Sequence, residues 1–348
     1  MTSVTTDAET PDAAFVRRPA PVRTFWIVLA VAALAAAVFA SVAIGSRHVG
    51  LTDIWRALLG HEDTLNEAAV TKRIPRTILA VVVGAALAMA GAVMQGVTRN
   101  PLADPGILGV NMGAALAIVV GITMFGLSSV TSYVWVALVG AGLSAVFVYT
   151  VGSLGRGGAT PLKLALAGTA TTVAFVSLIR AFILPRGDVS GVFLSWEIGG
   201  VGGASFGSLR QVAPFLIVGF VVALAVARPL NSLALGDELA TGLGERVAVT
   251  RAFAAIGAVL LCAGSVAAAG PIIFVGLVAP HVCRLVVGLD HRWLLPFSAV
   301  LGAVLLTVAD VLGRVVARPD EIDVGILAAL VGAPFFIYIV RKQKVREL

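Results

Sequence analysis

Few residues in this sequence have a type and position that could support chemistry inside its apolar stretches. Asp310 lies within one such stretch, and His281 lies near the end of another. A carboxylate and an imidazole could relay protons, but a charge in hydrocarbon costs at least about 2.5 kcal/mol. One intramembrane acid is thin support for proton coupling, so we expect Asp310 to face a cationic partner or the interior of a helix bundle.

The sequence lacks the motifs that an enzyme or an ATPase would need. It contains no H-E-x-x-H motif, no paired aspartates within apolar stretches, and no G-x-x-x-x-G-K-[ST] loop or even a Gly-Lys pair. Cys262 and Cys283 fall in apolar stretches, where a thiol usually behaves as a small buried hydrophobe. We therefore expect no enzymatic activity, no metal site and no cofactor bound by this chain.

Long apolar stretches are the elements that would position these side chains. Of 348 residues, 59% are apolar and 13% are charged, against roughly 25% charged in an average soluble domain. About 20 apolar residues in a helix cross roughly 30 Å of hydrocarbon. We predict an all-α membrane protein of about ten transmembrane helices, at residues 25–45, 76–97, 107–125, 131–152, 163–184, 211–228, 250–269, 272–289, 293–313 and 324–340.

The distribution of charge predicts the topology. An even number of spans puts both termini on one side, and basic residues near each terminus indicate the cytoplasm. Residues 1–23 are polar and do not have the pattern of a cleaved signal, so we expect a disordered cytoplasmic tail followed by one transmembrane domain over residues 24–348. The net charge of +6 fits this topology, and we expect no nucleic-acid binding.

The second and seventh predicted spans share a pattern of small residues. The two sets are Gly84, Ala85, Leu87, Ala90 and Gly91, and Gly257, Ala258, Leu260, Ala263 and Gly264. Because the spans are five apart, an odd number, they cross the membrane in opposite directions. This pattern predicts two inverted five-helix halves, although glycine and alanine could also recur by chance in an alanine-rich chain.

Two long ordered motifs carry the most specific information. The first contains Arg73, Ile74, Pro75, Arg76, Gly84, Gly91, Gln95, Gly96, Arg99, Asn100, Pro101, Leu102, Ala103, Asp104, Pro105, Gly106, Leu108 and Gly109. The second contains Gly270, Pro271, Phe274, Val275, Gly276, Leu277, Pro280, His281, Arg284, Asp310, Arg314, Gly325, Gly332, Ala333, Pro334, Phe335 and Phe336. Pro75 suits the first turn of a helix, and the Asn-Pro-Asp-Pro-Gly cluster predicts an ordered turn after that helix.

These motifs resemble the permease subunits of ATP-binding-cassette importers for iron–siderophore complexes, haem and cobalamin, the FecCD-type permeases. The resemblance implies a cell-membrane (inner-membrane) subunit that pairs with a second permease, as a homodimer or a paralogous heterodimer. It also implies two ATPase subunits, which would bind ATP and Mg²⁺, and an extracytoplasmic substrate-binding protein. The absence of a P-loop in this sequence fits that division of roles.

The residues from about 230 to 248, here named the coupling segment, connect the sixth and seventh predicted spans. Leucines recur there at i, i+4 and i+8, acidic residues mark a helix start, and glycines mark its end. This pattern predicts a short amphipathic cytoplasmic helix, and the resemblance implies that it docks into the ATPase. The candidate contact residues are Leu235, Gly236, Asp237, Glu238, Leu239, Ala240, Leu243 and Gly244.

The resemblance implies two further sites. Arginines at the positions of Arg73, Arg76 and Arg314 would meet glutamates of the binding protein at the outer face, whereas a purely structural role would be to anchor helix ends. Asn100 and Leu102 match positions that narrow the cytoplasmic exit.

The sequence departs from the family pattern before the last span. Asp323 stands where many relatives have proline, which we expect to alter the start of that span. The main alternative to an ATP-driven importer is a secondary transporter driven by an ion gradient, which would need more intramembrane carboxylates than Asp310 alone. A ferric siderophore is favoured over haem or cobalamin as cargo only by how common it is in the family.

Overall fold

A computed structural model of the chain describes residues 20–45, 49–154 and 160–342, and all regular structure in these ranges is helical. Seven helices are long and apolar enough to cross a membrane: α1 (Ala20–Ala43), α3 (Leu65–Thr98), α5 (Val130–Ser153), α6 (Pro161–Ile183), α8 (Phe206–Ala225), α11 (Val247–Ala269) and α13 (His291–Val316). Three apolar helices are shorter: α4 (Val110–Phe125), α12 (Val275–Val287) and α14 (Val324–Lys342). Each of the ten apolar stretches predicted from the sequence coincides with one of these helices.

Five shorter elements connect the apolar helices. They are α2 (Leu51–Leu58), the 3₁₀ helix η1 (Pro105–Leu108), α7 (Gly187–Ile198), α9 (Ala227–Leu233) and α10 (Asp237–Gly242). The sequence predicted only α10 among them, because a helix of 4 to 12 residues contributes too few periodic positions to stand out from its neighbours.

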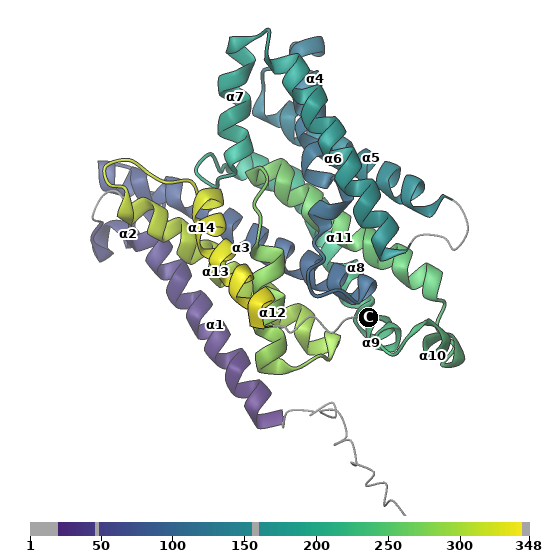
Figure 1. The fold of residues 1–348 in the computed structure, drawn as a ribbon. Coiled ribbons are helices and arrows are strands. Elements are labelled where there is room, and N and C mark those ends of the chain that lie inside the picture. The colour runs from purple at the N-terminus through teal and green to yellow at the C-terminus, as the bar shows by residue number, and fades with distance from the viewer. Residues whose placement is uncertain (1–19, 46–48, 155–159, 343–348) are drawn as a thin grey trace, which may run out of the picture.

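Helix α3 is the central element of the fold. Its 34 residues pack against α1, α8, α11, α12 and α13, and it runs between the group formed by α1, α12, α13 and α14 and the group formed by α4 to α7 (Figure 1). Glycines allow the closest approaches, because a Cβ on Gly84 would lie 2.4 Å from the carbonyl oxygen of Gly302, and one on Gly91 would lie 2.0 Å from that of Gly276. Such contacts let helices associate in lipid through van der Waals packing.

The start of α3 differs from the prediction. Helix α3 begins at Leu65, so Pro75 lies within the helix and not in its first turn. The Thr64 hydroxyl accepts a hydrogen bond from the backbone N–H of Glu67, and the Glu67 carboxylate accepts one from the backbone N–H of Thr64. This capping box starts the helix ten residues earlier than the proline signal did.

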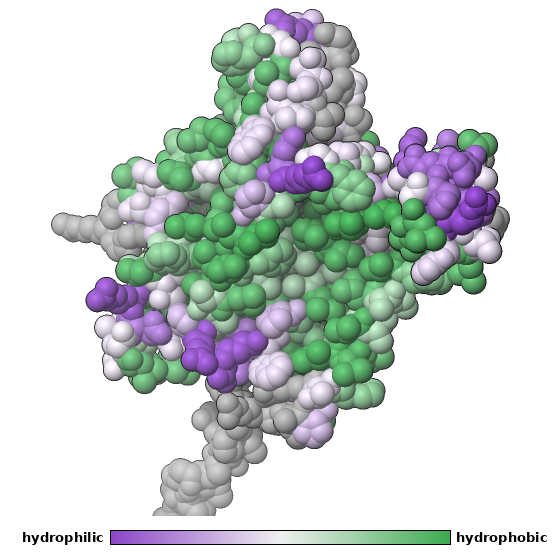
Figure 2. All heavy atoms as spheres, turned by 180° about the vertical axis from the view of Figure 1, so that it is seen from behind, coloured by the Kyte–Doolittle hydropathy of each residue, from purple (hydrophilic) through white to green (hydrophobic). Residues whose placement is uncertain are grey.

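The surface has the distribution expected of a protein in a membrane. Figure 2 shows hydrophobic residues across the middle of one face and hydrophilic residues gathered toward its margins. Large apolar side chains on α5, α6 and α8, including Phe147, Leu166 and Val221, are exposed in the isolated chain. Lipid can cover these side chains, so the chain is a multi-pass membrane protein.

The predicted tail, residues 1–23, is only partly covered by the structure. Residues 1–19 lie outside the described residues, and residues 20–23 form the first turn of α1. The predicted orientation rests on Arg17, Arg18, Arg23, Arg341, Lys342, Lys344 and Arg346. Of these, Arg17, Arg18, Lys344 and Arg346 lie outside the described residues.

Candidate functional site at the two ends of helix α3

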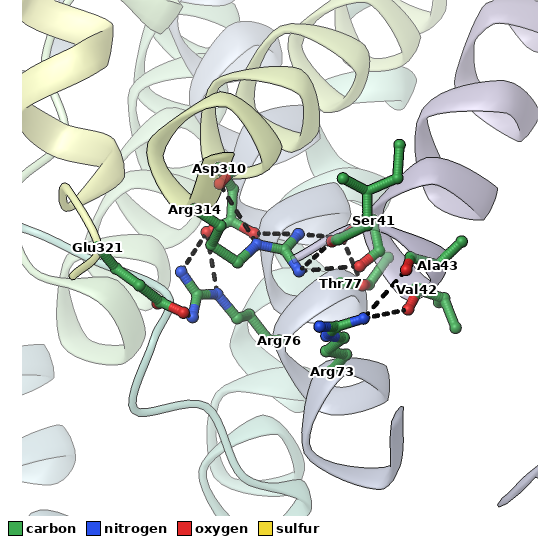
Figure 3. A network of polar contacts seen from close by, with 10 residues as sticks. Ser41, Val42, Ala43, Arg73, Arg76, Thr77, Asp310, Arg314 and Glu321 are labelled. Carbon is green, nitrogen blue, oxygen red and sulfur yellow. Dashed lines mark hydrogen bonds and ion pairs between the residues drawn. The ribbon is translucent and has the colours of Figure 1, made fainter. Parts of the chain in front are cut away.

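A largely buried network of charges lies at the third and fourth turns of α3. We name Arg73, Arg76, Arg314, Asp310 and Glu321 the arginine cluster (Figure 3). Arg76 donates hydrogen bonds from Nε (2.9 Å) and Nη2 (2.8 Å) to Asp310 Oδ1, and its Nη1 lies 2.5 Å from Glu321 Oε2. Arg76 therefore joins a buried carboxylate on α13 to a carboxylate at the rim, since the side chain of Asp310 is 1% exposed and that of Glu321 is 38% exposed.

Arg314 occupies the inner part of the arginine cluster. Its Nη2 lies 2.8 Å from Asp310 Oδ2, which is one helical turn away on α13. It also donates hydrogen bonds to the Ser41 carbonyl (2.8 Å) and the Ser41 hydroxyl (2.7 Å), and that hydroxyl pairs with Thr77 of α3 at 2.7 Å. Arg314 thereby connects α13 to α1 and α3, and it is 1% exposed.

Arg73 closes the end of α1. Its Nη1 donates hydrogen bonds to the carbonyl oxygens of Val42 (3.0 Å) and Ala43 (3.2 Å), which belong to the last turn of that helix. The last carbonyls of a helix lack partners within the helix, so a guanidinium group can satisfy them.

The structure therefore brings the three predicted docking arginines together but encloses two of them. Arg73 and Arg314 are buried, and Arg76 is the one whose ion pair reaches the partly exposed Glu321. The expectation that Asp310 pairs within the bundle is confirmed, because both Arg76 and Arg314 contact it.

The other end of α3 carries a second polar contact. Arg99, which caps α3 in the left-handed backbone region (φ +51°), donates from Nε to the Leu233 carbonyl at 2.7 Å and from Nη2 to Asp237 Oδ1. Arg251 of α11 donates to the same Asp237 oxygen at 2.9 Å. One carboxylate at the start of α10 thus meets cations from two long helices.

The coupling segment forms two short helices, α9 and α10, and not one continuous helix. Helix α10 covers Asp237–Gly242, with the start and end that the acidic residues and glycines predicted. Leu235 and Leu243 flank it and Leu239 lies within it, and the three are 48%, 66% and 62% exposed. Ala240 points inward and is fully buried, so the segment presents leucines outward while it packs against α9 and α11.

The predicted gate residues lie in the turn that follows Arg99. The Asn100 side-chain oxygen accepts a hydrogen bond from the Leu102 backbone N–H at 2.9 Å, and the Asp104 carboxylate accepts one from Gly106 at 2.7 Å. The prediction of an ordered turn is confirmed, because both side chains bond to the backbone two residues on.

A cavity of about 600 Å³ separates the end of α3 from part of the coupling segment. Gln95, Gly96 and Arg99 line it on one side, and Ala234 and Leu235 line it on another. Arg284 of α12, Asp290 and His291, the first residue of α13, line a third side.

The two polar sites lie on opposite sides of the apolar layer. Arg76 and Arg99 are 23 residues apart on α3, which corresponds to about 35 Å along a helix and exceeds the roughly 30 Å of a hydrocarbon core. The fold and its polar ends define a multi-pass helical membrane protein.

Comparison with known proteins gives the family. The FecCD transport family matches residues 33–342, and the chain belongs to that family. It is 41% identical to the probable siderophore transport system permease protein YfiZ of Bacillus subtilis, over 91% of this chain and 96% of that protein. It is 42% identical to the ferric enterobactin transport system permease protein FepD of Escherichia coli, over 78% of this chain and 81% of that protein.

Solved structures agree with the fold. An inward-facing conformation of a metal-chelate type ABC transporter superposes with a TM-score of 0.78 at 28% identity, covering 92% of this chain and 99% of that one. PsaBC from Streptococcus pneumoniae shares the fold at a TM-score of 0.55 and 16% identity.

Sequence reasoning missed the partners that hold these sites together. Ser41, Glu321 and Arg251 were not predicted to contact the arginine cluster or Asp237, and no local spacing indicates that they do.

Proposed function

We propose that this chain is the membrane-spanning permease subunit of an ATP-driven importer in the cell (cytoplasmic or inner) membrane. It translocates a ferric siderophore, or a related iron, haem or cobalamin chelate, that a substrate-binding protein delivers. The observation that carries the proposal is the placement of two polar sites at opposite ends of α3 in a member of the FecCD transport family. The names of YfiZ and FepD support a ferric siderophore as cargo.

The placement of the two polar sites at opposite ends of α3 also supports the partners that we assign to this chain. A second permease subunit, identical or paralogous, completes the pathway, and two ATPase subunits bind ATP and Mg²⁺ below it. The exposed leucines of the coupling segment are the surface that we assign to the ATPase. The turn at Asn100 and Leu102 is assigned to the cytoplasmic gate.

Docking of the binding protein is assigned to Arg73, Arg76 and Arg314 at the outer face. Because Arg314 is enclosed, an acidic partner reaches Arg76 first, where Glu321 already shows that a rim carboxylate can pair with it. Arg73 and Arg314 then hold α1 and α13 in place behind Arg76.

Ten transmembrane helices in two inverted halves, with both termini cytoplasmic, complete the proposal. The helix contacts support the repeat when α1, α3, α4, α5 and α6 are matched in order with α8, α11, α12, α13 and α14. Six helix contacts then each have an equivalent contact in the other half or across the two halves. Contact α1·α3 corresponds to α8·α11, α4·α5 to α12·α13, α4·α6 to α12·α14, α5·α6 to α13·α14, α3·α13 to α11·α5, and α3·α12 to α11·α4. The glycine motifs themselves are not equivalent, since Gly91 meets Gly276 of α12 whereas Gly264 meets Leu216 of α8.

Co-purification with the cognate ATPase tests the assignment of the coupling segment. Leu239→Glu places a charge on the exposed apolar surface of α10 and should abolish recovery of the ATPase with the permease. Leu59→Glu is a matched control, because Leu59 is equally exposed (61%) but follows α2, near the opposite end of α3. Normal recovery of the ATPase with Leu239→Glu would contradict the assignment.

A further inference from the structure

The Asp237 carboxylate connects α10 to the end of α3 and to α11, two long helices that pack against each other. Its Oδ1 accepts hydrogen bonds from Arg99, which caps α3, and from Arg251 of α11. Arg99 also donates to the Leu233 carbonyl at the end of α9, so it holds the coupling segment on both sides of the α9 to α10 connection. No other carboxylate in the described part of the chain forms ion pairs with arginines of both α3 and α11.

The α9 part of the coupling segment packs directly on α3, with Leu230 and Leu233 buried in the same core, so α10 is the part that depends on other links to α3. Helix α10 has only six residues, and the glycines that flank it, Gly236 (φ +111°) and Gly244 (φ +86°), have backbone conformations that side chains disfavour. The cavity of about 600 Å³ lies between the end of α3 and Leu235, where packed side chains would otherwise transmit a displacement. The ion pairs at Asp237 bridge this gap.

Arg99 is well placed to pass on a displacement. Its own backbone ends α3, and the next residues form the hydrogen-bonded turn of Asn100 and Leu102. A movement of α10 that pulls on the Arg99 guanidinium therefore acts on the first residue of that turn. Arg251 gives the same carboxylate a connection to α11, so both long helices that border the segment are engaged.

An ordinary surface ion pair is the simplest alternative. Asp237, Arg99 and Arg251 are 47%, 38% and 29% exposed at their side chains, and partly exposed pairs contribute little to stability. For that reason the loss of Asp237 should leave the fold intact, and a change in function without a change in stability separates the two explanations.

We propose that Asp237 is a positioning residue that ties the coupling segment to the end of α3 and to α11, so that movement of the segment reaches the turn at Asn100 and Leu102. The inference rests on the proposed role of the segment as the ATPase contact. It concerns the transmission of movement and not the binding of the ATPase.

The test uses the complete importer in proteoliposomes, with the cognate ATPase and binding protein and a radiolabelled ferric hydroxamate as the transported probe. Asp237→Asn removes the charge with little change in shape, and Asp237→Glu retains the charge. Glu62→Gln is the control, because it removes an exposed charge ahead of α3 that makes none of the described ion pairs. Arg99→Asn removes the guanidinium and keeps a residue that tolerates the left-handed backbone. Recovery of the ATPase, ATP hydrolysis and uptake are measured for each variant.

Asp237→Asn and Arg99→Asn should bind the ATPase and hydrolyse ATP, while uptake per ATP hydrolysed falls by about fivefold or more, the lower end of typical coupling effects. Asp237→Glu and Glu62→Gln should match the unmodified importer. Unchanged uptake per ATP in Asp237→Asn would overturn the inference and leave the ATPase contact standing. Loss of ATPase recovery in Asp237→Asn would instead place Asp237 in the ATPase contact and would also overturn the inference. Failure of the proposed function itself is detected separately, by normal ATPase recovery with Leu239→Glu.

Discussion

Arg76 and Asp310 are 234 residues apart in the sequence, yet two nitrogens of the Arg76 guanidinium reach the same oxygen of Asp310, at 2.9 and 2.8 Å. Arg314 lies 2.8 Å from the other oxygen of that carboxylate. One buried acid therefore holds two arginines, from α3 and from α13. Arg314 in turn donates to Ser41, which connects the acid to α1 as well. This arrangement determines what each substitution near the arginine cluster should do.

Asp310→Asn should destabilise the protein strongly. Removing one member of a buried ion pair leaves an uncompensated charge and typically costs about 3–5 kcal/mol. We expect a clear fall in Tm for the purified permease in detergent, with a loss of monodisperse protein. Asp320→Asn, at an exposed position in the loop between α13 and α14, is the control and should leave Tm unchanged. Equal Tm values for the two variants would show that the pairing contributes nothing to the fold.

Glu321→Gln should strengthen binding of the substrate-binding protein. The substitution removes the rim carboxylate that pairs with Arg76, so an incoming carboxylate meets no competitor. We expect affinity to rise by about two- to fivefold, equivalent to the ~0.5–1 kcal/mol of a partly exposed ion pair. Binding to the permease in nanodiscs would measure the change, with Arg76→Gln expected to weaken binding. Weaker binding by Glu321→Gln would mean that Glu321 itself contributes to docking.

Gly91→Ala should disturb the packing of α3 on α12. Its Cβ would lie 2.0 Å from the Gly276 carbonyl oxygen, and overpacking of this kind costs about 1–3 kcal/mol. Gly142→Ala in α5 is a matched control, because a Cβ there would meet no described atom within 4 Å. Thermal unfolding should separate the two variants, and a stable Gly91→Ala protein would contradict the close helix contact.

Asp290 should stabilise the protein at neutral pH but not in strong acid. It caps α13 by accepting a hydrogen bond from the backbone N–H of Arg292, and its hydrogen bonds from the Arg292 and Asn231 side chains lower its pKa, with Arg292 contributing most. A carboxyl whose pKa is lowered by folding adds stability above its ordinary pKa of about 3.9, and that stability is lost as the pH falls toward the lowered value. Asp290→Ala should cost about 0.5–2 kcal/mol at pH 7, as caps usually do.

The pH dependence of Tm provides the check on Asp290. The difference in Tm between the unmodified protein and Asp290→Asn should be largest at neutral pH and should shrink as the pH falls below about 4. Asn retains the capping geometry, so this comparison isolates the charge. A difference that grows toward low pH would contradict the lowered pKa.

The features that depend on neighbouring residues were predictable from the sequence. Runs of apolar residues located all ten apolar helices. Asp237 and Glu238 located the start of α10, and Gly242 and Gly244 located its end. Pro75 gave the wrong start for α3, because the capping box of Thr64 and Glu67 starts the helix ten residues earlier. The prediction used the proline and did not consider the capping box.

The features that depend on distant residues were not predictable. The sequence indicated that Asp310 needs a partner but not that Arg76 and Arg314 both supply it, because those contacts exist only after α3 and α13 pack together. Likewise, Arg99 and Asp237 each belonged to a recognised motif, yet their contact spans 138 residues. The burial of Arg314 also follows from the position of α1, which no local pattern specifies.

Transport by the reconstituted importer tests the central claim most directly. The proteoliposomes contain this permease and its ATPase, and the binding protein is loaded with a radiolabelled ferric hydroxamate. Iron should accumulate when ATP is supplied on the side of the membrane that carries the ATPase. Accumulation should stop when ATP is withheld. Accumulation by the permease alone on a proton or sodium gradient, with no need for ATP or the ATPase, would contradict the account and identify a secondary transporter.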